Sequence, residues 1–209
     1  MRDLVRRQDE HFLEFASSLT DDEWAAPSLC AGWTNKDVLS HLALGLQVRN
    51  TRLLTEMARQ RGSFDTANDI LTRTHTQRHS AAELIGQFDR GHDSPRGVGR
   101  LLPAPLLLGD HTVHHLDIAL ALGRSADLAP EVANAVLRVE TTVPNPFVPA
   151  RTRSRNLRLT ATDTGWSTGP AGRPQVSGPA DALISVLAGR GHARARLAGP
   201  GLPMLAARL

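Results

Sequence analysis

The 209-residue sequence has one cysteine, few aromatic residues and no long apolar run. The single cysteine, Cys30, excludes an internal disulfide framework. No charged start is followed by an apolar stretch suited to export or to membrane spanning, so we expect a cytoplasmic protein with no membrane partner. The sequence also lacks a glycine-rich phosphate loop, paired cysteines and a nucleophile elbow, which argues against the protein classes that carry these motifs.

The charge of the chain is more moderate than its isoelectric point suggests. The formal net charge is only +3, although the isoelectric point is about 10.3, because nearly all basic residues are arginines that keep their charge to high pH. Arginines gather near the C-terminus, within residues 151–158 and 190–196. They could meet phosphates, but these stretches have almost no aromatic residues for stacking bases. We therefore expect a solvated or anion-binding surface and no nucleic-acid partner.

Apolar residues make up 41% of the sequence, which is enough to fill a core. From Leu4 to Leu19 they recur close to the spacing of one helical face, which predicts a first helix. Thr20 and Glu23 have the spacing of a capping box for a short turn. Thr34 is a good N-cap for a second helix, and the apolar pattern predicts one long helix from there to Gly62.

Further helices are predicted up to about residue 143. Ser80 and Glu83 form another capping-box pair before a third helix, and a short helix over residues 67–73 is expected to precede it. Prolines 103 and 105 introduce the next helix, which Gly123 closes, and proline 130 opens one more.

The character of the sequence changes near residue 150. The segment "NLRLTATDTGWSTG" alternates apolar and polar residues on either side of a turn at residues 163–165, which is typical of a β-hairpin. Ser177 is expected to cap a short helix in "GPADALISVLAGRG", and "ARARLAG" to add a strand. We therefore expect a helical unit over residues 1–148 and a small α/β unit over residues 149–209.

Titratable side chains concentrate in "GDHTVHHLDIALALG", residues 109–123, which otherwise reads as a buried helix. Asp110 and His114 are four residues apart and therefore share a face, which Asp117 continues. His111 and His115 form a rival pair, rotated by roughly 100° around the helix. Only one pair can point squarely into a bundle, and the apolar pattern does not choose between them.

His41 lies among core-forming residues of the second predicted helix. Together with a carboxylate and a histidine from another helix, it would make a three-point set for zinc or a similar ion, with a position left for water or a thiol. The alternative is that these are hydrogen-bonded core side chains without a metal. Cys30 is expected to be a partly buried small residue in a loop.

Four stretches together resemble the mycothiol-dependent maleylpyruvate isomerase family, whose N-terminal part belongs to the DinB-like superfamily. They are "WAAPSLCAGWTNKDVLSHLA", "DHTVHHLDIALALG", "ATDTGW" and "GPADALISVLAGRG". The resemblance implies a mostly α fold, a four-helix bundle that holds a divalent metal, usually zinc, with a small C-terminal α/β domain.

The resemblance also implies the site residues. The metal ligands fall on His41, Asp110 and His114, which favours the Asp110 pair over the His111 pair, with aspartate where the isomerases have glutamate. Arg190 matches an arginine that holds the carboxylate of the substrate. The alternative for Arg190 is a solvent-facing side chain at the C-terminus of its own helix.

The activity implied is that of an isomerase or S-transferase acting on a small anionic or electrophilic metabolite. Zinc lowers the pKa of a coordinated thiol, so mycothiol would serve as a thiolate that adds to an activated double bond and allows it to rotate. A non-catalytic small-molecule-binding or metal-binding protein of the same fold is the alternative. We expect a monomer or a homodimer.

Overall fold

The computed structural model describes residues 1–209, apart from the side chain of Val98. The chain separates into two compact groups by its internal contacts: residues 1–107 with 117–126, and residues 108–116 with 127–209. Helix α8 (Ala104–Ala119) contributes residues to both groups. The boundary expected at residue 149 stays a prediction.

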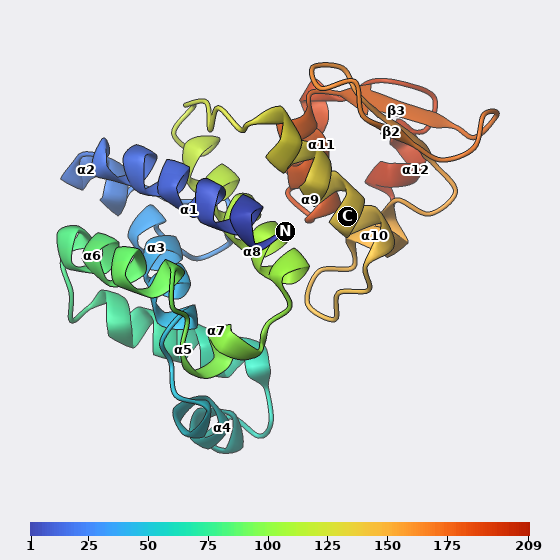
Figure 1. The fold of residues 1–209 in the computed structure, drawn as a ribbon. Coiled ribbons are helices and arrows are strands. Elements are labelled where there is room, and N and C mark those ends of the chain that lie inside the picture. Colours follow the sequence, from blue (N-terminus) through green and yellow to red (C-terminus); the bar gives the residue numbers. More distant parts are fainter. The chain divides into compact units, whose positions relative to one another are not determined.

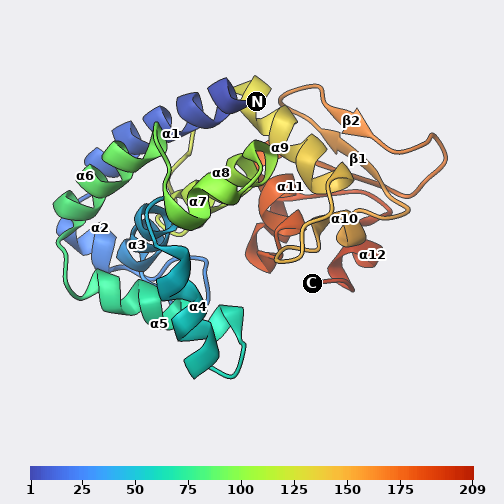
Figure 2. The same cartoon turned by 60° about the horizontal axis from the view of Figure 1, so that its bottom comes forward.

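The first group is built from helices (Figure 1), namely α1 (Arg2–Ser17), α2 (Asp21–Ala25), α3 (Asn35–Gly45), α4 (Asn50–Arg59), α5 (Phe64–Thr76), α6 (Ala81–His92) and α7 (Gly97–Leu101). Helix α3 packs against α5 and α6, and α1 lies beside α6 (Figure 2). Phe12 and Phe88 meet edge to face, with ring centroids 5.3 Å apart, and both are buried. Their contact joins α1 to α6 through the apolar core.

Local capping signals correctly located the starts of three of these helices. The side chains of Thr20, Thr34 and Ser80 each accept a bond from the backbone N–H three residues later, and the acidic residue there bonds back. The helix expected over residues 67–73 is longer, because it starts after Ser63 and becomes α5.

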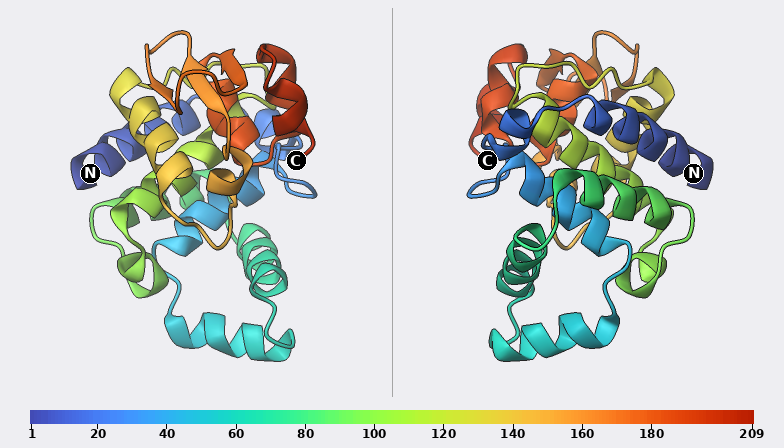
Figure 3. Two further views of the ribbon diagram at one scale, coloured as in Figure 1. Left: turned by 90° about the vertical axis from the view of Figure 1, so that its right-hand side faces the viewer. Right: turned by 90° about the vertical axis from the view of Figure 1, so that its left-hand side faces the viewer.

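The prediction of one long helix from residue 34 to residue 62 is wrong. Leu46 and Val48 continue the apolar pattern and are buried, but the chain leaves the helix there, and α4 lies apart from α3 (Figure 3). The Leu46 carbonyl accepts a bond of 2.7 Å from the Arg96 N–H. A Cβ on Gly97 would lie 1.9 Å from the Val48 carbonyl oxygen. The segment around residue 97 therefore occupies the space and the acceptor that a continuous helix would need.

The second group combines helices with a small sheet (Figure 1). Its elements are α9 (Pro130–Thr142), α10 (Ala150–Arg153), β1 (Arg158–Ala161), β2 (Ser167–Thr168), β3 (Gln175–Gly178), α11 (Ala180–Leu187), a 3-10 helix η1 (Gly191–Arg196) and α12 (Leu202–Ala206). Strands β1 and β2 pair antiparallel with Thr160 opposite Ser167, which confirms the predicted hairpin. Strand β3 pairs parallel to β1, and α11 packs on α9. The mostly α fold class with a small C-terminal sheet is confirmed.

Two local predictions in this group are wrong. Ser177 does not cap α11, because it lies in β3 and exchanges backbone bonds of 2.8 Å with Ala198. The Asp163 carboxylate accepts from the Ala180 N–H instead, at 3.0 and 3.2 Å. The expected strand "ARARLAG" is mostly the 3-10 helix η1, with a single bridge at Ala198. Gly178 leaves room for Leu197, because a Cβ at position 178 would lie only 2.5 Å from the Leu197 side chain.

Among the residues that the structure describes, no helix is both long and apolar enough to cross a membrane.

Candidate metal centre

Asp110 and His114 lie one turn apart on α8. The His114 Nε2 atom is 3.6 Å from Asp110 Oδ1, and the His114 side chain is 12% exposed against 43% for Asp110. The helix alone brings these atoms together, because side chains four residues apart project from the same face.

His41 lies on α3, and its ring is oriented by a neighbour on α5. Its Nδ1 atom is 3.2 Å from the Asn68 Oδ1 atom. An amide oxygen can only accept, so Nδ1 donates in this bond, and Nε2 is the ring nitrogen that can act as a ligand when the imidazole is neutral. A histidine held in this way by its second nitrogen has the arrangement typical of metal ligands.

His41, Asp110 and His114 each offer a ligand atom, and these atoms lie within 4.8 Å of one another. Around one zinc ion with bonds of about 2.0–2.1 Å, tetrahedral ligand atoms lie about 3.4 Å apart. Two imidazoles and one carboxylate are a donor set that suits zinc and similar ions. The residues present therefore fit a divalent ion, and their role as ligands stays a prediction.

A second group shares His114 and contains Cys30 and Asp117, again with ligand atoms within 4.8 Å of one another. The Cys30 Sγ–H group donates to Asp117 Oδ2 at 2.9 Å, and the Leu29 N–H donates to the Asp117 carbonyl at 3.1 Å. The helical spacing predicts that Asp117 continues the face of Asp110, but no sequence pattern predicts that Cys30 lies beside Asp117. His111 and His115 are buried and belong to neither group of described residues.

Asp69 on α5 anchors the loop that carries Cys30 and Trp33. Its carboxylate accepts from Trp33 Nε1 at 2.7 Å and from Arg73 Nε at 2.9 and 3.0 Å, while Arg73 also donates to the Gly32 carbonyl at 2.7 Å. Burial acts to raise the pKa of Asp69, but these hydrogen bonds outweigh it and hold that pKa below its usual value. The ionised carboxylate fixes the loop, and the Trp33 ring lies 5.3 Å from that of His41.

Comparisons with known proteins identify the family of the chain. The family model for the mycothiol maleylpyruvate isomerase N-terminal domain matches residues 5–119, which is more than half of the chain. The chain belongs to this family. The matched region contains His41, Asp110 and His114 as well as Cys30 and Asp117.

Solved structures resemble the chain beyond the region that the family model matches. A histidine-to-alanine variant of the mycothiol-dependent maleylpyruvate isomerase has 16% sequence identity and a TM-score of 0.57, over 95% of this chain and 90% of that one. At that identity the likeness shows the fold alone. A second structure of a mycothiol-dependent maleylpyruvate isomerase has 15% identity and a TM-score of 0.45, over 91% and 88% of the two chains. No curated protein sequence matches the chain significantly.

Arg190 lies outside the region matched by the family model, between α11 and η1. Its backbone N–H donates to the Ser185 carbonyl at 2.8 Å, and its Nη1 atom donates to the Ala188 carbonyl at 3.1 Å. The contact with Ala188 is the one expected of an arginine at the C-terminus of its own helix.

Proposed function

We propose that this member of the family is a metal- and thiol-dependent enzyme, an isomerase or S-transferase that acts on a small anionic or electrophilic metabolite. The observation that carries the proposal is the donor set of His41, Asp110 and His114, within 4.8 Å of one another, in a chain of the maleylpyruvate isomerase family. The solved structures of similar fold are described as mycothiol-dependent, which supports mycothiol as the thiol.

Each ligand has a separate part in holding the ion. His41 offers Nε2, because its Nδ1 proton is engaged by Asn68 at 3.2 Å. His114 offers a second neutral nitrogen, and Asp110 supplies the negative charge that a divalent cation needs. When bound, a divalent ion such as zinc lowers the pKa of a coordinated thiol, so that mycothiol would be a thiolate at neutral pH.

We propose that Arg190 binds a carboxylate of the substrate. A guanidinium group presents two parallel N–H donors that match the two oxygens of a carboxylate. Arg190 is half-buried, and partial burial strengthens an ion pair relative to one in open solvent. Its bond to the Ala188 carbonyl would help to hold the guanidinium group in place.

The decisive experiment measures metal content and thiol-dependent turnover together. Protein purified without a polyhistidine tag is analysed for metals before and after incubation with zinc, then assayed on maleylpyruvate and a panel of electrophiles with and without mycothiol. We expect one divalent ion per chain and turnover that requires mycothiol.

Two variants make the test specific. His114→Ala should weaken metal binding by more than about 100-fold, because residues that only support a ligand already contribute about 10–100-fold. His192→Ala changes an exposed histidine outside the donor set and should leave metal binding unchanged. No metal uptake by the unmodified chain would contradict the metal site. Metal uptake without turnover of any electrophile would favour the non-catalytic alternative.

A further inference from the structure

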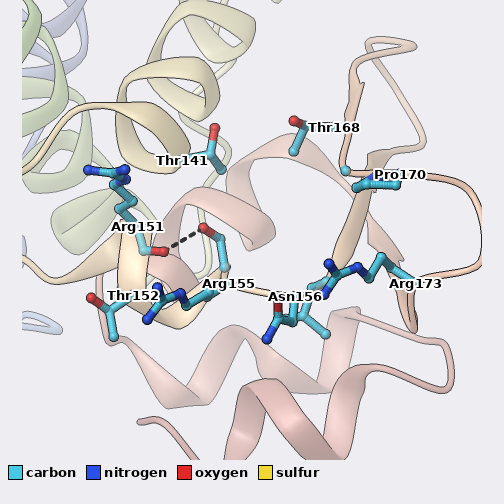
Figure 4. Close-up of a pocket in the computed structure, with 11 residues that line it drawn as sticks. Thr141, Arg151, Thr152, Arg155, Asn156, Thr168, Pro170 and Arg173 are labelled. Atoms are coloured by element: carbon cyan, nitrogen blue, oxygen red, sulfur yellow. Dashed lines mark hydrogen bonds between the residues drawn. The ribbon is translucent and has the colours of Figure 1, made fainter.

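A separate cavity of about 500 Å³ lies within the C-terminal group of residues. Its walls come from the end of α9, from α10 with the turn that follows it, and from the loop after β2. Figure 4 shows Arg151, Thr152 and Arg155 on one side and Pro170 and Arg173 on the other. The proposed metal and substrate residues are not among the residues that line it.

The cavity carries a concentrated positive charge. Three arginines line it, and none of the described residues in its wall is acidic. The guanidinium groups of Arg151 and Arg155 have no hydrogen-bond or ion-pair partner in the part of the chain that the structure describes. Arg173 donates to the side-chain oxygen of Asn156, which is a neutral acceptor. These charges are therefore not neutralised within the protein.

The nearest acidic residue in the sequence does not offset this charge. Glu140 precedes the lining residue Thr141 but is buried, and burial raises its pKa well above the usual value, although Arg153 and Arg190 act to lower it. Burial therefore favours the neutral form of this carboxyl group over its charged form.

The wall of the cavity is fixed by backbone contacts. Arg208 Nη1 donates to the carbonyls of Arg153 and Arg155, at 2.6 Å each, and so holds the turn between α10 and β1. Gly169, with a φ of +92°, lies so close to this turn that a Cβ would be 2.4 Å from the Leu157 carbonyl oxygen. The backbone that carries Arg155 is therefore held in place, while the side chains of Arg151, Arg155 and Arg173 are exposed and reach a ligand from solvent.

We propose that this cavity binds a small organic phosphate. The unneutralised arginines around this cavity favour a ligand with more than one negative charge, and arginine matches phosphate oxygens with paired N–H donors. Thr152 and Thr168 also line the cavity, whereas the Thr141 hydroxyl donates to the Leu137 carbonyl of its own helix at 2.7 Å. The volume is that of a small-molecule site. The absence of aromatic side chains among its described lining residues disfavours a single-stranded nucleic acid, which needs stacking platforms.

Direct binding to the full-length, chelator-treated chain tests this site independently of the proposed enzyme activity. Calorimetric titrations use pyrophosphate and a hexose monophosphate as probes, at about 20 mM and about 200 mM salt. We expect one site per chain and weaker binding at the higher salt concentration, because the attraction is between charges. His114→Ala should bind both probes as the unmodified chain does.

Three arginine variants locate the site. Arg151→Ala and Arg155→Ala should each weaken pyrophosphate binding about tenfold or more, the loss expected when charge-assisted hydrogen bonds to an anion are removed. Arg194→Ala removes an exposed arginine of η1 that does not line the cavity, and it should bind pyrophosphate normally. Circular dichroism checks that each variant is folded, and the two cavity variants test the site separately.

Several outcomes would overturn the proposal. If pyrophosphate did not bind at low salt, or if all three arginine variants bound it equally well, the cavity would not be an anion site. Succinate binding as tightly as pyrophosphate would assign the cavity to carboxylates. An oligonucleotide that binds more tightly than pyrophosphate, with the same dependence on Arg151 and Arg155, would make it a nucleic-acid surface.

Discussion

At the scale of single residues, burial changes the acidity of the Glu140 carboxyl group. It lies on α9 and is 7% exposed, and neither of its carboxylate oxygens has a hydrogen-bond partner among the described residues. Burial raises the pKa of Glu140 well above its usual value, while the charges of Arg153 and Arg190 oppose the rise. A folded-state pKa above the unfolded value means that this group favours folding below the unfolded pKa and opposes it as pH rises through the folded pKa.

We expect Glu140→Gln to stabilise the chain at high pH. Glutamine has a similar shape without a charge, so the variant should gain about 1–3 kcal/mol at pH 8, and the gain should vanish below about pH 4. Urea denaturation at both pH values measures it. Glu14→Gln, at a side chain 84% exposed, should change the free energy of unfolding by less than about 0.5 kcal/mol. A Glu140→Gln variant that is less stable at every pH would contradict this account.

Asp110 tests the metal site without disturbing the core. Its side chain is 43% exposed, so Asp110→Ala should change the stability of the metal-free chain by no more than about 0.5 kcal/mol. Metal affinity should fall sharply, because a charged ligand is lost, and thiol-dependent turnover should fall with it. Equilibrium dialysis against zinc and thermal denaturation with a chelator give the two readings. Full metal occupancy in Asp110→Ala would exclude Asp110 as a ligand.

Arg190→Ala should have effects opposite to those of Asp110→Ala on metal binding and on substrate binding. Metal content should not change, while kcat/KM for anionic substrates should fall by the equivalent of about 1.5–3 kcal/mol, the range for a hydrogen bond to a charged group. Steady-state kinetics with an anionic and a neutral electrophile separate the effects, because only the anionic one should respond. If the turnover of every anionic substrate were unchanged, Arg190 would not bind the substrate, and its role would be the contact with the Ala188 carbonyl at the C-terminus of α11.

These residues differ in how far the sequence could predict them. The spacing of Asp110 and His114 follows from helix geometry, and their pairing at 3.6 Å was predictable. The choice of that pair over His111 and His115 needed the family resemblance, because α8 is apolar around much of its circumference. The contact between Cys30 and Asp117 joins residues 87 positions apart, and no local pattern encodes it.

At the scale of elements, helix starts depended on whether the capping group was local. The boxes at Thr20, Thr34 and Ser80 were readable because donor and acceptor lie three residues apart. The end of α3 could not be predicted from the local sequence, because the segment that ends this helix lies near residue 97. The cap of α11 comes from Asp163, 17 residues before the N–H group that it accepts from.

Removing that cap should weaken α11. Asp163→Ala deletes the acceptor for the Ala180 N–H and should cost about 1 kcal/mol, within the range for loss of an N-cap. Asp163→Asn keeps an acceptor oxygen and should recover most of the loss. Chemical denaturation of the full chain compares the three proteins. If a further variant, Ser177→Ala, lost more stability than Asp163→Ala, the Asp163 contact would not be the one that stabilises the start of α11.

At the scale of the whole molecule, metal binding should be linked to global stability. A ligand that binds only the folded chain stabilises it by about 2.7 kcal/mol at a free concentration 100 times its Kd. For a chain of 209 residues, each kcal/mol raises Tm by about 2–4 °C, so zinc in that excess should raise Tm by about 5–11 °C. Because the donor set draws on both α3 and α8, His41→Ala should abolish most of this shift, whereas His192→Ala should retain it. Scanning calorimetry with zinc and with a chelator makes the comparison. A shift of the same size in His41→Ala would place the stabilising ion elsewhere, and no shift in the unmodified chain would mean that folding is not coupled to zinc.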